Sequence, residues 1–335
     1  MSILLISLFC APIADAKEHL IFSIDLIRHG DRTPIHEIPK SPHTWKEGLG
    51  ELTPEGMKQE FQLGVELRKR YIDQYHLLPP RYLAETIYVR STDLNRTLMS
   101  AQSLLLGLYP LGTGSSLPAA FQPIPIHTVP KLQDDLLNAK PSSNIFSIAI
   151  LYVKTHNAWK NKTANLKNAF AKWYEATGLD VNDPFKFDSL SDTLNVRALH
   201  HVPFPQGISS EEGEKIISLG QEAVVTYFKY KQVSYPMGHH FLRAVADYLK
   251  QASDGKSPLK YVLFSGHDSS IMSVMNTLGT PLDKMPRYAS HLNFALFNDD
   301  KKQYLKISFN DEPVMIPACG GNTCTLEQFY KLANQ

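Results

Sequence analysis

Strands and helices alternate at both ends of this chain, and that alternation limits the folds it can adopt. Apolar runs at residues 20–27, 86–90 and 261–266 are each strand-like, and helical segments follow them. Two later runs, HLNFALF and QYLKISF, alternate in the same way near the C-terminus. Because strands interleaved with helices need crossover connections, this pattern predicts an α/β fold. We expect a mixed, largely parallel central sheet flanked by helices.

Residues 31–130 also show where one helix starts and where a weak strand lies. Thr53 followed by Pro54 predicts a helix start, because proline is tolerated at the first helical position. This helix is predicted to carry one apolar face, formed by Met57, Phe61, Val65 and Ile72. The segment IPIHTVP at 124–130 predicts a weak edge strand, since its prolines cannot donate backbone hydrogen bonds.

The chain changes character between residues 131 and 234, where strand-like runs thin out and helical segments dominate. We therefore predict a smaller, mainly helical cap domain over 131–234. It is inserted into an α/β core made of residues 17–130 and 235–335. Open α/β sheets bind ligands outside the carboxyl ends of their strands, so polar residues at strand ends become the candidates for a site.

The first sixteen residues, MSILLISLFCAPIADA, form a short apolar stretch that ends in an A-x-A-like sequence. This pattern predicts a signal peptide over 1–16, and hence a secreted or periplasmic protein. The stretch lacks a Lys or Arg, and a buried N-terminal strand or a lipidated Cys10 are the alternatives. It is too short to span a bilayer, so no transmembrane anchor is expected.

The cysteines and the net charge limit the kinds of site and partner that are expected for this protein. Cys319 and Cys324 in CGGNTC are predicted to close a small disulfide loop in an oxidising compartment. Two cysteines alone make a poor zinc site. A net charge of +1 with no long basic stripe argues against a nucleic-acid partner.

Polar residues follow three of the predicted strands. The candidate site consists of Arg28, His29, Arg32, Arg90, His267 and Asp268. Three arginines at one sheet edge favour an oxyanion such as phosphate, because the planar guanidinium group matches its oxygens in bidentate fashion.

The histidine and the aspartate of this set carry the candidate chemistry. Nearby positive charge lowers the pKa of His29, and a neutral imidazole is a competent nucleophile toward phosphorus. The same arginines would repel a metal cation, so neither a metal nor another cofactor is expected. Asp268 fits two roles equally well from its spacing, a helix N-cap or a proton donor to a leaving oxygen.

These residues resemble a known family. RHGDRTP at 28–34 is similar to the RHGxRxP signature of the histidine acid phosphatases, and HD at 267–268 is similar to their second motif. The segments GELTPEGMKQEFQLGVELRKRY and YVRSTDLNRTLMSA resemble the prostatic and lysosomal acid phosphatase-like branch of that family.

The resemblance implies that His29 attacks phosphorus and forms a phosphohistidine, and it assigns proton donation to Asp268. It implies that phosphate is held by Arg28, Arg32, Arg90 and His267. Arg96 is interpreted as structural, because it lies six residues beyond Arg90 in the following helix.

The implied activity is metal-independent hydrolysis of phosphate monoesters at acid pH. Expected partners are small phosphorylated substrates, with phosphoproteins and phospholipids also in range, and the resemblance allows a homodimer. One alternative is a phytase-like or otherwise specialised phosphomonoesterase, although Ser270 stands where phytases of this superfamily commonly carry Asn. The other alternative is a non-catalytic phospholigand-binding protein on the same fold.

Overall fold

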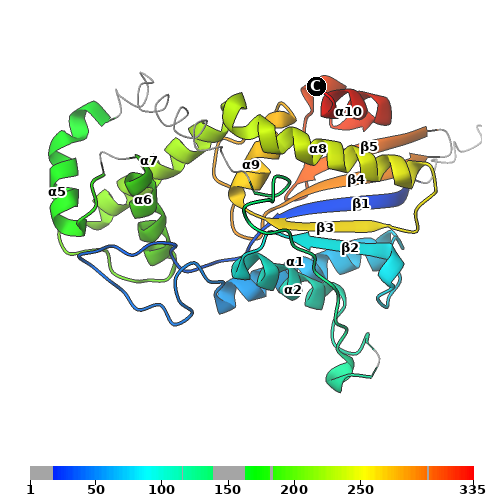
Figure 1. Ribbon diagram of the computed structural model, residues 1–335, viewed down its shortest axis with the longest axis horizontal. Helices are drawn as coiled ribbons and strands as arrows, with labels where there is room; N and C mark the ends of the chain where they lie inside the picture. The colour runs from blue at the N-terminus through cyan, green and yellow to red at the C-terminus, as the bar shows by residue number, and fades with distance from the viewer. Residues whose placement is uncertain (1–17, 115, 139–162, 182–183, 300–301) are drawn as a thin grey trace, which may run out of the picture.

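A seven-stranded mixed sheet forms the centre of the protein (Figure 1). A computed structural model describes residues 18–114, 116–138, 163–181, 184–299 and 302–335, so the predicted signal peptide lies outside the described residues. The strands are β1 (His19–Arg28), β2 (Ile87–Ser91), β3 (Tyr261–Gly266), β4 (His291–Asp299), β5 (Lys302–Phe309), β6 (Glu312–Pro313) and β7 (Thr323–Thr325). Their order across the sheet is β2-β3-β1-β4-β5-β6, with β7 also paired to β5.

The parallel part of the sheet comprises β2, β3 and β1, and the antiparallel part begins at β4. Strand β1 pairs in parallel with β3, aligning Arg28 with Gly266, and antiparallel with β4. The carboxyl ends of β1, β2 and β3 therefore meet at one edge of the sheet. The predicted α/β class with a mixed sheet is confirmed.

Helices cover both faces of this sheet (Figure 1). On one face lie α1 (Pro54–Arg68), extended by a π-helical turn (Lys69–Gln74), and α2 (Asn95–Leu108); on the other lie α8 (Lys231–Ser253), α9 (Asp268–Thr277) and α10 (Leu326–Ala333). Single 3-10 turns occur at Ala84–Thr86, Pro118–Ala120, Ala164–Leu166 and Pro317–Cys319. No helix of the described ranges is long and apolar enough to cross a membrane.

Helix α1 starts as predicted, but only part of its predicted apolar face is buried. The side chain of Thr53 caps it by accepting a hydrogen bond from the amide of Gly56. The buried residues are Gly56, Glu60, Leu63, Gly64 and Leu67, whereas Phe61 is exposed. The backbones of α1 and α2 touch here, because a Cβ added to Gly64 would lie 2.0 Å from the carbonyl oxygen of Leu104. Close backbone contact requires glycine at the crossing, so of the predicted apolar stripe only Ile72, in the π-helical extension, is buried.

The segment 124–130 is not a strand. It contributes one isolated bridge, in which His127 exchanges backbone hydrogen bonds with Val89 and Ser91 of the edge strand β2. Prolines at 123, 125 and 130 remove the donors that a longer ladder would need. The prediction of a weak strand there is wrong.

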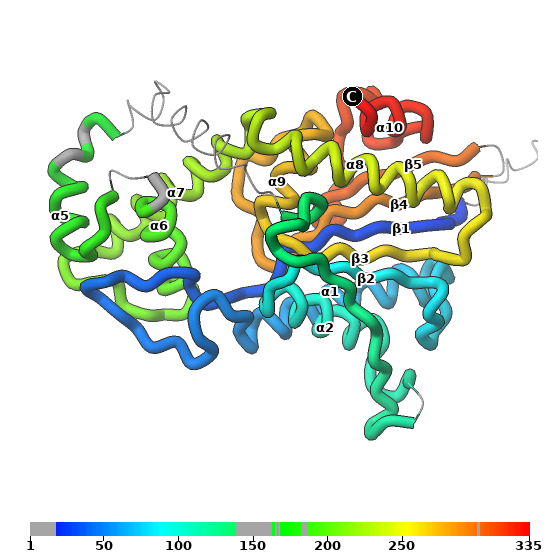
Figure 2. Tube along the Cα trace, viewed as in Figure 1, coloured from blue at the N-terminus to red at the C-terminus, as the bar shows by residue number. Residues whose placement is uncertain are grey.

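A separate group of helices projects from the carboxyl end of the sheet (Figure 2). It comprises α5 (Lys167–Thr177), α6 (Pro184–Leu199) and α7 (Ser210–Phe228), which we call the cap. The cap has its own hydrophobic core around Trp173, Phe187 and Ile216. Ile38, from the loop that follows β1, is fully buried in the same cluster. The loop after β1 is therefore packed into the cap.

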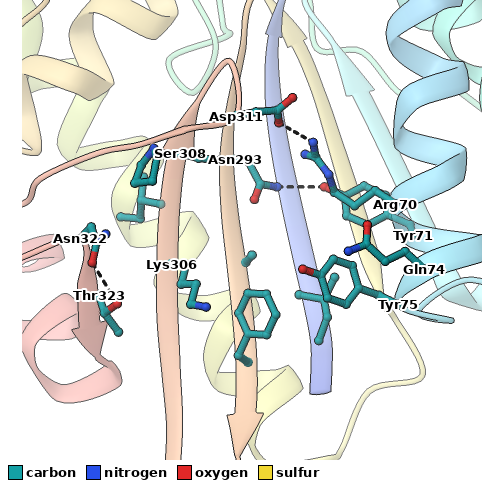
Figure 3. A pocket seen from close by; sticks show the side chains of 15 residues that line it. Arg70, Tyr71, Gln74, Tyr75, Asn293, Lys306, Ser308, Asp311, Asn322 and Thr323 are labelled. Atoms are coloured by element: carbon teal, nitrogen blue, oxygen red, sulfur yellow. Dashed lines mark hydrogen bonds and ion pairs between the residues drawn. The ribbon is translucent and has the colours of Figure 1, made fainter. Parts of the chain in front are cut away.

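Asp25 is a buried carboxylate inside β1, and the structure gives it a role outside the strand-end site. It accepts hydrogen bonds from the hydroxyl of Tyr71 at 2.7 Å and from the side-chain amide of Asn293 at 3.1 Å. Tyr71 and Asn293 also line a groove of about 430 Å³ beside β4 and β5, together with Arg70, which pairs with Asp311 (Figure 3). Asp25 thus belongs to a polar cluster on the α1 face of the sheet.

The predicted disulfide between Cys319 and Cys324 is present. It closes the turn that leads into β7, and Cys324 is fully buried against the main core.

Candidate active site

The two candidate histidines come together where β1 and β3 end. His29 follows β1 and donates its backbone amide to the carbonyl of Gly266, the last residue of β3, at 3.1 Å. His267 comes next after Gly266, and the two imidazole rings lie edge to face with their centroids 5.5 Å apart. Parallel pairing of β1 and β3 therefore brings together residues that are 238 positions apart, as the strand-end rule predicts.

His29 is held in one tautomer. Its Nδ1 lies 2.8 Å from the carbonyl oxygen of Gly30, which can only accept, so Nδ1 carries the proton and Nε2 keeps its lone pair. The ring is 2% exposed. Burial, followed by the positive charges of Arg28 and Arg96, holds the pKa of His29 well below its usual range. The imidazole is therefore neutral and has one free nitrogen.

Gly30 is required for space rather than for turn geometry. It is absent from the glycines with positive φ in the described chain. A Cβ added to it would lie 2.3 Å from the carbonyl oxygen of Gly56, in the first turn of α1. Gly56 is equally confined, because its own Cβ would lie 2.2 Å from the carbonyl oxygen of Asp31. The loop after β1 thus rests directly on the backbone of α1.

Arg28 and Asp268 form an ion pair beside His29. The Nη2 of Arg28 lies 2.9 Å from an Oδ of Asp268, and its guanidinium lies 4.2 Å from the ring centre of Tyr288. Burial alone would raise the pKa of Asp268, but Arg28 and the other nearby positive charges outweigh it, so the pKa is lowered. Asp268 is consequently ionised while Arg28 has no other anion to bind.

His267 stands at the N-terminus of α9 as predicted. Its Nε2 lies 3.0 Å from the hydroxyl of Thr92, and its backbone amide donates to the hydroxyl of Ser270. Burial and then the charge of Arg96 lower the pKa of His267 to about 3, so the ring is neutral. Ser270 therefore supports the loop that carries His267 and Asp268.

Arg90 does not join the cluster, which corrects the expectation from the sequence. Side chains alternate along β2, so Val89 faces the core with α1 and α2 while Arg90 points to the opposite face. There it lines a cavity beneath α8 and pairs with the fully buried carboxylate of Asp134 at 2.7 Å. The pleat of the strand takes Arg90 away from the histidines.

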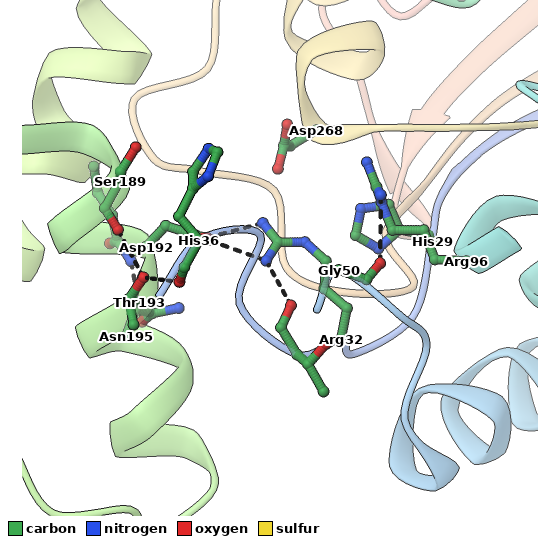
Figure 4. Close-up of polar contacts among 12 residues, drawn as sticks. His29, Arg32, His36, Gly50, Arg96, Ser189, Asp192, Thr193, Asn195 and Asp268 are labelled. Atoms are coloured by element: carbon green, nitrogen blue, oxygen red, sulfur yellow. Dashed lines mark hydrogen bonds and ion pairs between the residues drawn. The ribbon is translucent and has the colours of Figure 1, made fainter. Parts of the chain in front are cut away.

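Arg96 is the arginine that the sequence reasoning missed. It lies in the first turn of α2, and Figure 4 shows its side chain beside that of His29. Its one hydrogen bond to a described residue is a long one, 3.4 Å from Nη1 to the carbonyl oxygen of Gly50. Burial and the neighbouring Arg32 lower the pKa of Arg96 to about 10. Arg96 is a cation without a carboxylate partner among the described residues. The segment RSTDLNR is consistent with a place for Arg96 in the site, since a side chain in the first turn of a helix can reach back to the end of the preceding strand.

Arg32 completes the cluster and is 5% exposed. Its Nη1 and Nη2 bind the two carboxylate oxygens of Asp192, on α6 of the cap, at 3.0 and 2.8 Å (Figure 4). Burial alone would lower the pKa of Arg32, but Asp192 raises it above its ordinary value. The cap therefore touches the candidate site through a charged group.

Three arginines and two neutral histidines thus surround one position at the sheet edge. Within the described part of the chain, no group of three or more His, Cys, Asp or Glu side chains could hold a metal ion. What the cluster is suited to receive is an anion, because it combines rigid guanidinium donors with a cation that lacks a partner.

Comparison with known proteins identifies the family. The model of the histidine phosphatase superfamily (branch 2) matches residues 37–310. The chain belongs to this family. Human testicular acid phosphatase is 31% identical over 98% of this histidine phosphatase and 82% of its own length. The lysosomal acid phosphatase of Xenopus laevis is 32% identical over 99% and 80%, and human prostatic acid phosphatase 30% over 95% and 85%.

Solved structures agree on the fold of this histidine phosphatase. The phytase of Klebsiella sp ASR1 superposes with a TM-score of 0.69 at 19% identity, covering 95% of this chain and 96% of its own. The phytase of Citrobacter braakii gives a TM-score of 0.70 at 16% identity, covering 94% and 97%. The resemblance to histidine acid phosphatases, and with it the class of phosphoric monoester hydrolases, is confirmed.

Proposed function

We propose that this protein hydrolyses phosphate monoesters by attack of His29 on phosphorus, with Asp268 as the proton donor. The observation that carries the proposal is the tautomer of His29. The carbonyl of Gly30 fixes the proton on Nδ1, so the Nε2 lone pair is available at acid pH. A nucleophile that stays neutral in acid is what a metal-free phosphoryl transfer to nitrogen requires.

The arginines supply the phosphate site. Arg28, Arg32 and Arg96 each bring a guanidinium group toward His29, and their charges depress the pKa of that ring. A bound phosphate dianion would be the counter-anion that Arg96 lacks, and it would spread its charge over all three groups. We assign phosphate binding to Arg28, Arg32, Arg96 and His267, with Arg96 in the place first expected for Arg90.

Binding of the substrate also changes the pKa of Asp268, the proposed proton donor. Arg28 lowers the pKa of Asp268 while the site is empty. A phosphate dianion bound to Arg28 offsets that positive charge, so the pKa of Asp268 rises and an acid medium can supply its proton. The protonated carboxyl donates to the leaving oxygen as the P–O bond breaks and the phosphohistidine forms. The resulting carboxylate then accepts a proton from the water that hydrolyses the P–N bond.

The family also supports proposals for the location, the pH optimum and the substrates of the enzyme. Relatives include proteins named lysosomal and prostatic acid phosphatase, and these names support an acid optimum and a location outside the cytosol. Secretion or export to the periplasm is proposed from the predicted signal peptide. We propose small phosphorylated molecules as substrates, with the cap helices α5, α6 and α7 forming the outer wall of the site. A homodimer stays a prediction.

Replacement of His29 tests the proposal. His29→Ala should abolish turnover of p-nitrophenyl phosphate at acid pH in the folded variant, because the nucleophile is lost. His240→Ala is the matched control, since His240 pairs with Asp135 outside the site and should keep full activity. Wild-type enzyme quenched during turnover should hold labelled phosphate that is stable to alkali and lost in acid, as expected for a P–N bond. Full activity of His29→Ala, or complete inhibition of the wild type by a chelator, would contradict the mechanism.

A further inference from the structure

Among the described residues of the cap, Asp192 alone forms an ion pair with an arginine of the proposed phosphate site. It lies on α6, 160 positions from Arg32 in the sequence, and binds the guanidinium through both carboxylate oxygens. The side chain of Arg32 is 6% exposed and that of Asp192 is 26% exposed, so water screens this pair only partly. Such fork-to-fork pairing fixes the plane of the guanidinium as well as its position.

The pairing occupies one end of the guanidinium and leaves the other end open. Asp192 uses Nη1 and Nη2, whereas the Nε–H of Arg32 is buried and has no acceptor among the described residues. Figure 4 shows Asp192 and His29 on opposite sides of Arg32. The Nε edge is therefore the edge that remains for a phosphate held beside His29.

The helix that carries Asp192 is itself fixed to the loop after β1. Thr193 donates its hydroxyl to the carbonyl of His36 at 3.0 Å. His200, just past the end of α6, places Nε2 at 2.8 Å from a carboxylate oxygen of Asp31. The position of Asp192 is thus set by contacts to the same segment that bears Arg32.

We propose that Asp192 is a positioning residue for phosphate recognition, which holds the outer end of Arg32 so that its Nε edge faces the phosphate. The inference rests on the proposed function, because it requires phosphate to bind beside Arg32. A long arginine side chain freed from its carboxylate would gain rotational freedom and lose part of this alignment. The affinity of the core for phosphate then depends on a residue of the cap.

A double-mutant cycle tests this dependence. Asp192→Ala should weaken the binding of inorganic phosphate, measured by titration calorimetry, by roughly tenfold. The KM for p-nitrophenyl phosphate should rise by a similar factor, while kcat stays within about twofold. In an Arg32→Ala background the same substitution should have no further effect, because Asp192 acts through Arg32. Asp192→Asn, which keeps the shape of the side chain, should give an intermediate loss.

Controls separate this role from a merely structural one. Lys172→Ala removes another ion pair of the cap, to Glu212 at 2.7 Å, and should leave phosphate binding unchanged. Unchanged or tighter phosphate binding in both Asp192 variants would overturn the inference, as would additive effects in the double variant. Wild-type phosphate binding in Arg32→Ala would instead overturn the proposed phosphate site itself, so the two failures are distinguishable.

Discussion

The α/β core and the helical cap contribute to the proposed site in different ways. The core brings His29 and Asp268 to the sheet edge through the pairing of β1 with β3 and the start of α9. The cap brings Asp192, which touches the core arginine Arg32 rather than the position of the reacting phosphorus. This division assigns bond breaking to the core and part of phosphate affinity to the cap. Substitutions of His29 and Asp268 should accordingly act on the chemical steps, and those at Asp192 on KM.

The largest expected effect comes from the acid of the core. Asp268→Asn should lower kcat/KM by about 10²- to 10⁴-fold for alkyl phosphates, because the leaving alkoxide then departs without a proton in the step that forms the phosphohistidine. The loss should be much smaller for p-nitrophenyl phosphate, whose leaving group is a weak base. The dependence of kcat/KM on leaving-group pKa across a series of aryl phosphates measures this difference, because kcat/KM excludes the hydrolysis of the phosphohistidine that all substrates share. Equal losses for good and poor leaving groups would contradict the assignment of Asp268.

The next largest effect on activity separates Arg96, in the first turn of α2, from Arg90, within β2. Only the substitution of Arg96 should lower kcat/KM. Arg96→Ala should reduce kcat/KM by about 10- to 100-fold, because a buried cation beside His29 is lost. Arg90→Ala should leave kcat/KM of the folded enzyme unchanged but lower the free energy of unfolding by roughly 3 kcal/mol, since it strands the buried carboxylate of Asp134.

Steady-state kinetics and urea unfolding of both variants provide the measurement. A large rise in KM for Arg90→Ala would show that Arg90 binds phosphate after all. Wild-type kinetics for Arg96→Ala would contradict the assignment of Arg96 to the phosphate site.

The smallest effect on catalysis concerns Glu60, a core residue away from the chemistry. Its side chain is fully buried in α1, neither oxygen has a partner among the described residues, and burial raises its pKa well above the usual range. A raised folded-state pKa means that the contribution to stability is complete below the unfolded pKa and is lost as pH rises toward the folded pKa. Glu60→Gln should therefore unfold less readily than wild type at pH 8, by about 1.4 kcal/mol for each pH unit over which the carboxyl must be kept neutral.

Urea unfolding at pH 5 and pH 8 checks this expectation, with kcat and KM expected to stay at wild-type values. A difference between the two proteins that is the same at both pH values would contradict it.

The elements of the core were predictable because they follow local rules. The run YVLFSG predicts strand β3 with the bounds that the structure has, 261–266. Thr53 followed by Pro54 predicts the start of helix α1. His29 and His267 could be paired in advance because parallel strands end together. The error at Arg90 was avoidable in principle, since the alternation of apolar Ile87 and Val89 with Arg90 already assigns that side chain to the other face.

The contacts between core and cap were beyond such rules. Nothing in the sequence around Asp192 distinguishes it from an ordinary exposed carboxylate on a helix, because its partner is 160 positions away. Asp25 is similar, since its meaning depends on Tyr71 and on Asn293 of β4. Long-range polar pairing is decided by the folded arrangement of elements, which local spacing does not encode.

The contact between Gly30 and Gly56 has a consequence for how such proteins diverge. Neither position can acquire a side chain while the other stays in place, since a Cβ on either one would collide with backbone. A compensating change elsewhere cannot relieve the collision, because the obstacle is main chain rather than a replaceable side chain. Both positions are therefore restricted to glycine for as long as this backbone contact is kept, and the sequence constraint on the loop of His29 extends to a residue 26 positions downstream of Gly30.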